Sequence, residues 1–135
     1  MKLTDVTPNL IVSNIDRSIA FYRDVLGFNV TTTVPDASPF VFAWMQRDEV
    51  KVFLNAVEGV QHDVPALAQR AVGGTATLFI VLEASSAAEG VDAMFKAVDG
   101  KAKLVMPLKD QFYGLREFAV EDPDGYVIFF AQRLG

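Results

Sequence analysis

The 135-residue sequence contains no cysteine, and it has only one histidine and one tryptophan. Without cysteine the chain can form neither a disulfide nor a thiolate metal site. No apolar run approaches the ~18 residues that a membrane-spanning helix needs. No apolar stretch follows Lys2, so the start of the sequence does not resemble a secretory signal. We therefore expect a cytoplasmic protein that does not interact with membranes.

Basic residues are also in the minority, with 12 Lys and Arg against 17 Asp and Glu and a net charge of −5. No basic patch is visible, which argues against a nucleic-acid partner. The charge would favour the approach of a cationic ligand, although a charge of this size is also ordinary for solubility. Neither a G-x-S-x-G elbow, a P-loop nor a dinucleotide fingerprint is present. The single histidine, His62, lies in a connecting segment, where a solvated surface residue is expected rather than a metal ligand.

Length and a hydrophobic content of 51% predict one domain, residues 1–135, with a substantial core. In the first half, Asn14 is a good N-cap for a helix whose apolar stripe ends shortly before Gly27. The elements expected there are a strand over 5–12, a helix over 15–26, a strand over 28–34, and a hairpin of 40–47 with 50–57 around the loop Asp48-Glu49.

The second half repeats this order. A strand is expected over 75–82. The capping box from Ser86 to Glu89 predicts that a helix opens at Ser86 and runs to about Val98. A strand over 102–108 and a closing hairpin from Phe112 follow. Matching helix positions, including Gly27 with Gly100, favour a true repeat. The expected parts are a first βαβββ module over about 1–58, a connector over 59–73 with one helical turn after Pro65, and a second module over about 74–135.

The closing hairpin organises the second module. Asp122-Pro123-Asp124-Gly125 predicts a type I turn with a bulge, because Asp122 can accept backbone N–H groups and Gly125 supplies a positive φ. That register pairs Ala119 with Phe129, Glu117 with Ala131 and Phe118 with Phe130. One face of the hairpin then carries apolar core residues. The other carries a mixture of charged, small and apolar residues, which suits a cleft. Turn formation explains the two aspartates better than acid chemistry does.

Two motifs carry a family resemblance. The segment Asn14–Phe28 (NIDRSIAFYRDVLGF) resembles the first-helix signature of the vicinal-oxygen-chelate superfamily, which includes glyoxalase I, extradiol dioxygenases and bleomycin resistance proteins. Arg116-Glu117-Phe118 with the Asp122–Gly125 turn resembles the last hairpin of the bleomycin-resistance branch. The resemblance implies an α+β fold in which two tandem βαβββ modules form a U-shaped half-barrel cleft.

Enzymes of the superfamily hold a metal with His, Glu or Gln at four strand positions. Carried over one by one, these positions fall on Thr7, Phe53, Thr77 and Phe129. Phenyl rings cannot coordinate a divalent cation, and neutral threonine is a poor protein ligand. The resemblance therefore implies that the metal chemistry of the superfamily is lost here, and we expect no metal, no cofactor and no catalytic residue.

The expected cleft is instead aromatic with a few polar points, which is the usual composition of a small-molecule site. A two-residue loop at Asp48-Glu49 would place Trp44 opposite Phe53 and Phe42 opposite Asn55. Glu117 and Arg116 form either a ligand-orienting pair or a plain cross-strand pair, and only one of them can point into the cleft. The cleft residues expected from the sequence are Thr7, Asn9, Trp44, Phe53, Asn55, Thr77, Phe79, Glu117 and Phe129.

The function expected from the resemblance is a metal-free protein that sequesters an aromatic or cationic small molecule in a dimer cleft, as bleomycin resistance proteins do. An enzyme of the same superfamily, a metal-dependent lyase, isomerase or dioxygenase, is the first alternative. A dimeric interaction module with a vestigial cleft is the second. A homodimer is expected in addition because open half-barrels have edges and faces that need covering.

Overall fold

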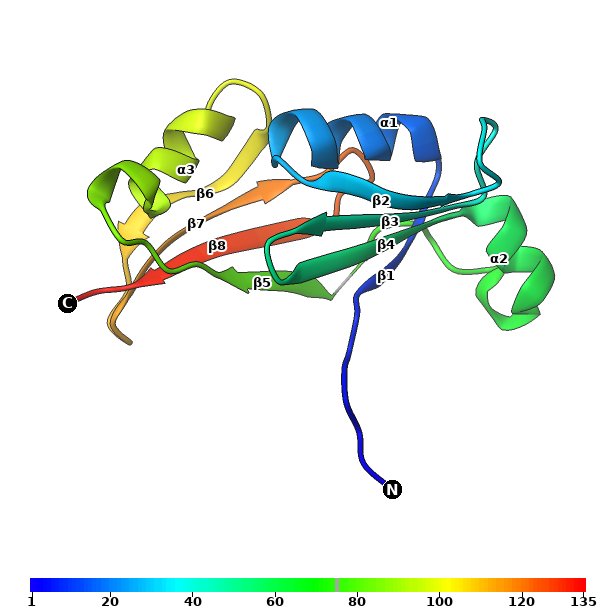
Figure 1. The fold of residues 1–135 in the computed structure, drawn as a ribbon, viewed down its shortest axis with the longest axis horizontal. Helices are drawn as coiled ribbons and strands as arrows, with labels where there is room; N and C mark the ends of the chain where they lie inside the picture. The colour runs from blue at the N-terminus through cyan, green and yellow to red at the C-terminus, as the bar shows by residue number, and fades with distance from the viewer. Residues whose placement is uncertain (75) are drawn as a thin grey trace. The chain divides into compact units, whose positions relative to one another are not determined.

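The computed structural model describes residues 1–74 and 76–135, and the chain divides into two compact units, Met1–Gly73 and Gly74–Gly135. Each unit contains a four-stranded mixed sheet with helical segments, which confirms the predicted α+β class (Figure 1). The strand order is β1-β4-β3-β2 in unit 1 and β5-β8-β7-β6 in unit 2. In both sheets the first strand of the unit runs parallel to the last one. The two halves of the chain thus repeat one topology.

The elements of unit 1 are β1 (Asn9–Val12), α1 (Ile15–Ala20), the π-helical turn η1 (Phe21–Val25), β2 (Asn29–Val34), β3 (Phe42–Arg47), β4 (Val50–Ala56), α2 (Val57–Asp63) and the 3₁₀ turn η2 (Pro65–Leu67). Those of unit 2 are β5 (Thr77–Val81), the 3₁₀ turn η3 (Ala87–Glu89), α3 (Val91–Val98), β6 (Lys103–Asp110), β7 (Leu115–Glu121) and β8 (Val127–Arg133). The predicted strand start at Thr75 lies outside the described residues.

The first helix begins as the sequence predicts. The Asn14 side chain accepts a hydrogen bond from the Arg17 amide at 3.1 Å, and Gly27 ends the helical segment with φ +77°. Ile15, Ile19, Tyr22 and Leu26 are buried, and α1 packs on β3 and β4, as Figure 1 shows. One face of the unit 1 sheet is therefore covered by this helix.

The second helix begins later than predicted. The Ser86–Glu89 capping box does not open α3. Ala87–Glu89 form η3 instead, and the Ser85 hydroxyl donates to the Glu89 carboxylate at 2.6 Å. α3 starts at Val91, whose amide donates to Oε1 of Gln132, from β8, at 2.7 Å. A Cβ on Gly90 would lie 2.6 Å from that same oxygen, so a larger residue there would displace the Gln132 side chain. A tertiary contact has replaced the local cap.

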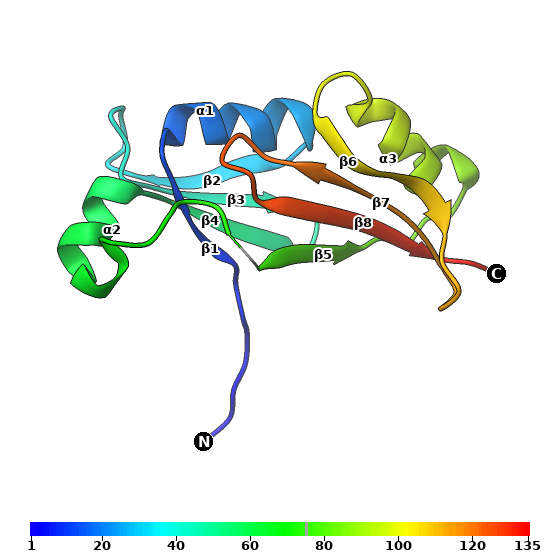
Figure 2. The ribbon, with the colours of Figure 1, turned by 180° about the vertical axis from the view of Figure 1, so that it is seen from behind.

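The segment after β4 also differs from the prediction. Residues 57–63 form α2, where the sequence predicts a strand end followed by a connector. The helix has no side-chain cap at Ala56 and no buried residue, so neither a capping pattern nor an apolar stripe announces it. The turn after Pro65 is present as η2. Viewed from behind in Figure 2, α2 follows β4, and it packs on β4 and β1.

Both predicted hairpins have the predicted register. Arg47 pairs with Val50, so Asp48-Glu49 is the two-residue loop, with Asp48 at φ +52°. In unit 2 the Gly125 amide donates to the Asp122 carbonyl at 3.0 Å, and Gly125 has φ +90°. One carboxylate oxygen of Asp122 accepts the amides of Asp124 and Tyr126, both at 2.9 Å. Turn formation therefore explains this aspartate.

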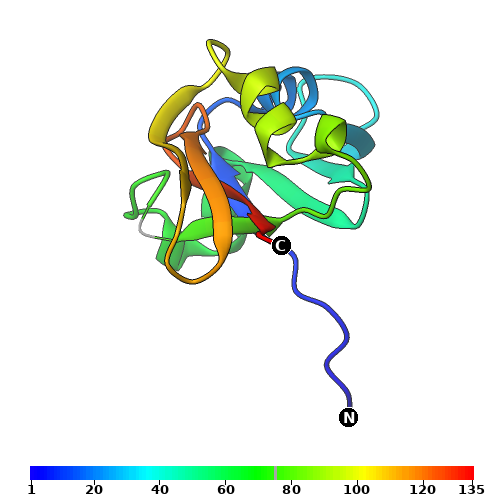
Figure 3. The same cartoon turned by 90° about the vertical axis from the view of Figure 1, so that its left-hand side faces the viewer.

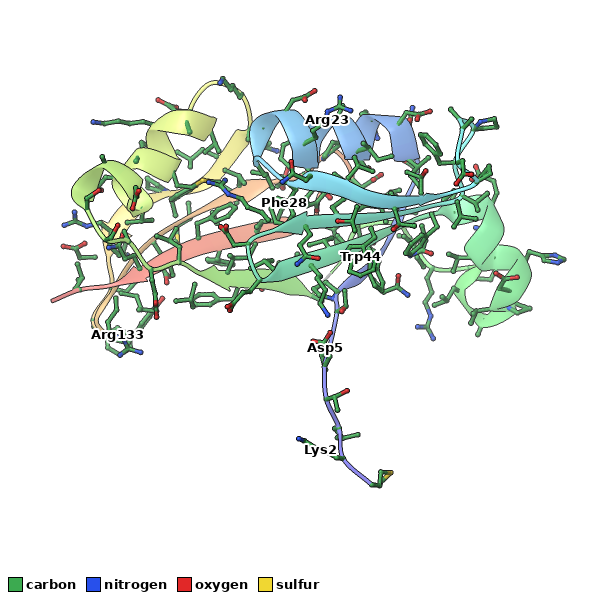
Figure 4. All side chains as sticks on the ribbon, viewed as in Figure 1. Lys2, Asp5, Arg23, Phe28, Trp44 and Arg133 are labelled. Atoms are coloured by element: carbon green, nitrogen blue, oxygen red, sulfur yellow. The ribbon has the colours of Figure 1, made fainter. Side chains whose placement is uncertain are left out.

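The N-terminal segment before β1 extends away from the unit 1 sheet, as the turned view in Figure 3 shows. Figure 4 labels Lys2 and Asp5 on this segment, and the Asp5 carboxylate pairs with Lys51 of β4. Hydrogen bonding to Lys51 is the main reason why the pKa of Asp5 lies below its usual value. Within residues 1–74 and 76–135, no helix has both the length and the apolar character that crossing a membrane requires.

Candidate ligand-binding faces

The face of the unit 1 sheet that points away from α1 carries a cluster of aromatic rings. Because side chains alternate along a strand, the pairs Trp44–Phe53 and Phe42–Asn55 share this face, while Ala43, Met45, Val52 and Leu54 are buried on the other. The Phe53 ring lies 5.2 Å from that of Phe42 and 5.8 Å from that of Trp44, both edge to face. All three rings remain partly exposed. They offer faces and edges to a planar molecule.

Polar side chains form hydrogen bonds with one another at the border of this face. The indole N–H of Trp44, labelled in Figure 4, donates to the Gln46 side chain at 3.1 Å, and Gln46 in turn donates to the Asp48 carbonyl at 3.0 Å. The Asn55 amide donates to the Asn9 side-chain oxygen. Asn9 is the parallel-strand neighbour of Phe53. Asn9 and Asn55, two of the polar residues that the sequence predicts, therefore lie beside the rings, and Gln46 is an additional one.

The corresponding face of the unit 2 sheet carries a second ring pair. Phe79 lies beside Phe129 through the β5–β8 register, with ring centroids 5.7 Å apart and planes tilted by 32°. Phe79 is 49% exposed. Across β8 and β7, Phe129 pairs with Ala119, and Ala131 pairs with Glu117. This face therefore combines two rings and two small residues with the carboxylates of Glu117 and, at the end of β7, Glu121.

Glu117 is the unusual member of that set. It is only 1% exposed, yet it belongs to a face with no other buried charge among the described residues. Its Oε1 accepts hydrogen bonds from the Tyr113 hydroxyl and from the Gln111 amide, the latter at 3.2 Å. The hydrogen bond to Glu117, then burial, and then the negative charge raise the pKa of Tyr113 above its usual value. Tyr113 and Gln111 belong to the turn between β6 and β7, and no local sequence signal marks them as partners of Glu117.

A family model described as the Glyoxalase/Bleomycin resistance protein/Dioxygenase superfamily matches residues 4–130. The chain belongs to this superfamily. Bleomycin resistance proteins of Geobacillus stearothermophilus and Staphylococcus aureus (strain MRSA252) are 32% identical over 136 residues, covering 94% of this chain and 95% of each relative. The predicted resemblance to the superfamily and to its bleomycin-resistance branch is thereby confirmed.

Solved structures also resemble this chain. A protein of unknown function from Agrobacterium tumefaciens str. C58 is 26% identical with a TM-score of 0.74, covering 99% of this chain and 95% of that one. TioX from Micromonospora sp. ML1 is 23% identical with a TM-score of 0.73, covering 97% and 99%. A glyoxalase/bleomycin resistance protein/dioxygenase from Nocardioides is 22% identical with a TM-score of 0.75, covering 99% and 85%. The last two show similarity of fold.

The positions where superfamily enzymes place metal ligands do not form a ligand set here. Thr7 precedes β1, and its hydroxyl donates to Asp5 at 3.4 Å. Thr77 opens β5 opposite Val127. The register places Asn9 and Phe79, rather than the two threonines, beside Phe53 and Phe129. Within residues 1–74 and 76–135, no group of three or more His, Asp or Glu side chains could hold a metal ion. The residues present do not fit the metal of the superfamily.

Arg116 and Glu117 do not pair with each other. The Arg116 guanidinium donates to Asp110 at 2.6 and 3.1 Å and to Asp92 of α3 at 3.2 Å, away from Glu117. This arginine lowers the pKa of Asp110, mainly by hydrogen bonding. Arg116 also borders a cavity of about 390 Å³ beside the start of α3, with Ser85, Ser86, Gln132 and Arg133. The two neighbours thus serve opposite faces of the sheet, and Arg116 ties β7 to β6 and α3.

Proposed function

We propose that this chain binds and sequesters a flat aromatic molecule, neutral or cationic, without a metal ion. The observation that carries the proposal is the cluster of Trp44, Phe53 and Phe42 on an open sheet face with polar side chains at its border. Membership of the superfamily and 32% identity to bleomycin resistance proteins support a ligand-binding role. Rings supply contact area and stacking, and the net charge of −5 favours a cation over an anion.

The predicted site residues remain part of this proposal. Thr7, Asn9, Trp44, Phe53 and Asn55 would contribute from unit 1, and Thr77, Phe79, Glu117 and Phe129 from unit 2. Each set lies on the sheet of its own unit. The rings would stack on the ligand, and the amides of Asn9 and Asn55 would hydrogen-bond to its edge.

The test uses the fluorescence of Trp44, the only tryptophan. Titration with metal-free bleomycin or ethidium should quench it saturably, whereas the anion S-hexylglutathione should not. Phe53→Ala should weaken binding by roughly tenfold, since it removes one ring contact and the apolar area of that ring. Phe21→Ala, which removes a partly buried ring from η1, is the matched control and should bind like the wild type. Unchanged fluorescence with every planar compound would rule out the proposed function.

Metal content separates this proposal from a metal-dependent lyase, isomerase or dioxygenase of the same superfamily. Protein purified without chelators should contain less than about one metal ion per ten subunits. Zinc, nickel and manganese should not raise its melting temperature, because only a ligand that binds the folded state stabilises it by mass action. Stoichiometric metal together with a matching rise in melting temperature would favour the enzyme instead.

We further propose that the protein is a twofold symmetric homodimer. Each four-stranded sheet has two edge strands, β1 and β2 in unit 1 and β5 and β6 in unit 2, and an open edge can pair with a second chain. Static light scattering at micromolar concentration should give twice the chain mass of 14.8 kDa. A mass equal to that of one chain would contradict this assembly.

A further inference from the structure

One of the two carboxylate oxygens of Glu117 has no hydrogen-bond partner among the described residues. Its Oε1 has two donors, Tyr113 and Gln111, but within the described residues its buried Oε2 has no hydrogen-bond partner. A buried acceptor without a partner costs free energy, and nearly all such groups in folded proteins are paired. Arg116, the neighbouring cation along the chain, is engaged with Asp110 and Asp92. The described part of the fold therefore supplies no donor for Oε2 of Glu117.

The residues that flank Glu117 on its own face of the sheet are small. Ala131 lies directly opposite across β8, and Ala119 is the next residue of β7 on the same face. Phe129 lies diagonally across from Glu117, and diagonal neighbours in an antiparallel pair are about 7–8 Å apart. Phe79 extends the ring surface beyond Phe129. A carboxylate and a ring platform are thus offered at a fixed spacing on one face.

Glu117 is covered by a turn whose side chains are largely exposed. Tyr113 is 49% exposed and belongs to the turn 111–114, where Gly114 has φ +86° and the adjoining Phe112 is 98% exposed. Partly exposed side chains change rotamer within nanoseconds, so the Tyr113 hydroxyl can leave the carboxylate without unfolding the sheet. Movement of Tyr113 is therefore the route by which we expect a donor to reach Glu117, which is itself 1% exposed.

We propose that Glu117 is a specificity-determining residue that accepts a hydrogen bond from an N–H group of a cationic ligand, an ammonium or amidinium carried on a flat ring. The ring lies on Phe79 and Phe129, and the N–H group takes the free Oε2 of Glu117. This inference rests on the proposed function, because it names the chemical class that the same protein would take. It goes beyond charge attraction: the site selects a cation that donates a hydrogen bond over one of equal charge that cannot.

The selectivity follows from the two kinds of contact. Ring faces attract any cation, including a quaternary ammonium. A free carboxylate oxygen in a buried position gains most from a donor, and a hydrogen bond between charged partners is shorter and stronger than a neutral one. A trimethylated nitrogen keeps the charge but cannot satisfy Oε2, and it is too bulky to lie at hydrogen-bond distance.

The experiment compares naphthylethylammonium with its trimethylammonium counterpart, which has the same ring, linker and charge. Calorimetric titration of the full chain should show that the wild type prefers the N–H donor by about tenfold or more. Glu117→Gln should reduce this preference to about two-fold or less. Glu121→Gln is the matched control: it removes a carboxylate from the same strand and the same face, one that pairs with Lys103 at 3.3 Å. It should keep the preference.

Tyr113→Phe gives a second readout that does not depend on changing Glu117. Removal of the hydroxyl takes away one donor that competes for the carboxylate, so the N–H ligand should bind more tightly while the trimethylated one is unchanged. Equal binding of the two salts to the wild type would overturn the inference and leave the proposed function standing. A preference that survives Glu117→Gln would also overturn the inference and leave the proposed function standing. The same holds if ethidium binds but neither naphthalene salt does. If ethidium and bleomycin do not bind either, both the inference and the proposed function are wrong.

Discussion

Replacement of Phe118 by alanine is expected to lower the free energy of unfolding by about 3–5 kcal/mol. Phe118 is fully buried, and its ring contacts those of Phe95 from α3 and Phe130 from β8, at centroid distances of 5.4 Å each. Truncation removes both contacts and leaves a cavity between helix and sheet, which the surrounding strands can only partly close.

Phe112→Ala provides the matched control for Phe118→Ala. It deletes the same atoms from a ring that is 98% exposed, so it should change stability by no more than about 0.5 kcal/mol. Urea unfolding followed by circular dichroism measures both variants against the wild type. Equal losses for the two substitutions would show that Phe118 does not belong to the core of unit 2.

Removal of the Asp122 carboxylate is the second change with a large expected effect. Asp122 is 5% exposed, and one of its oxygens holds the amides of Asp124 and Tyr126. Asp122→Ala leaves both donors without this acceptor, and the free energy of unfolding should fall by about 1–3 kcal/mol. Asp122→Asn keeps an acceptor oxygen of the same shape and should recover most of the loss.

Hydrogen exchange locates this effect within the hairpin. In Asp122→Ala, the amides of Asp124 and Tyr126 should exchange faster than in the wild type, while the amides of β3 and β4 in the other unit keep their relative protection. An Asp122→Ala variant with wild-type stability and wild-type exchange at both amides would show that the backbone turn alone sets the register.

The parts of the fold that sequence reasoning predicts are those set by local chemistry. The Asp122–Gly125 turn contains its own carboxylate acceptor and its own positive-φ residue, so the β7–β8 register follows from a few adjacent positions. The same holds for the cap at Asn14 and for the loop at Asp48-Glu49. Because antiparallel register is fixed by the turn, the pairing of Trp44 with Phe53 could also be predicted.

The parts that it misses depend on residues far apart in the sequence. The start of α3 is decided by Gln132, from the other end of unit 2, and this contact overrides the local Ser86–Glu89 pattern. The neighbours of Phe53 and Phe129 are set by parallel pairing, in which no turn fixes the register, so the sequence alone does not identify Asn9 and Phe79 as their partners. Tyr113 meets Glu117 only because the turn after β6 folds back over the sheet.

The parallel pairing of first and last strands also sets an order for assembly during synthesis. β1 leaves the ribosome first in unit 1, yet its only ladder partner in the sheet is β4, so it must wait until β2 and β3 have passed. Unit 1 needs no strand from unit 2 to complete its own ladder, and so its sheet can close while the second unit is still being translated. Until β4 emerges, the apolar residues of β1 are exposed to chaperones, and a nascent chain stalled while β4 is still inside the ribosomal exit tunnel should be captured by them more readily than one stalled after β4 has emerged.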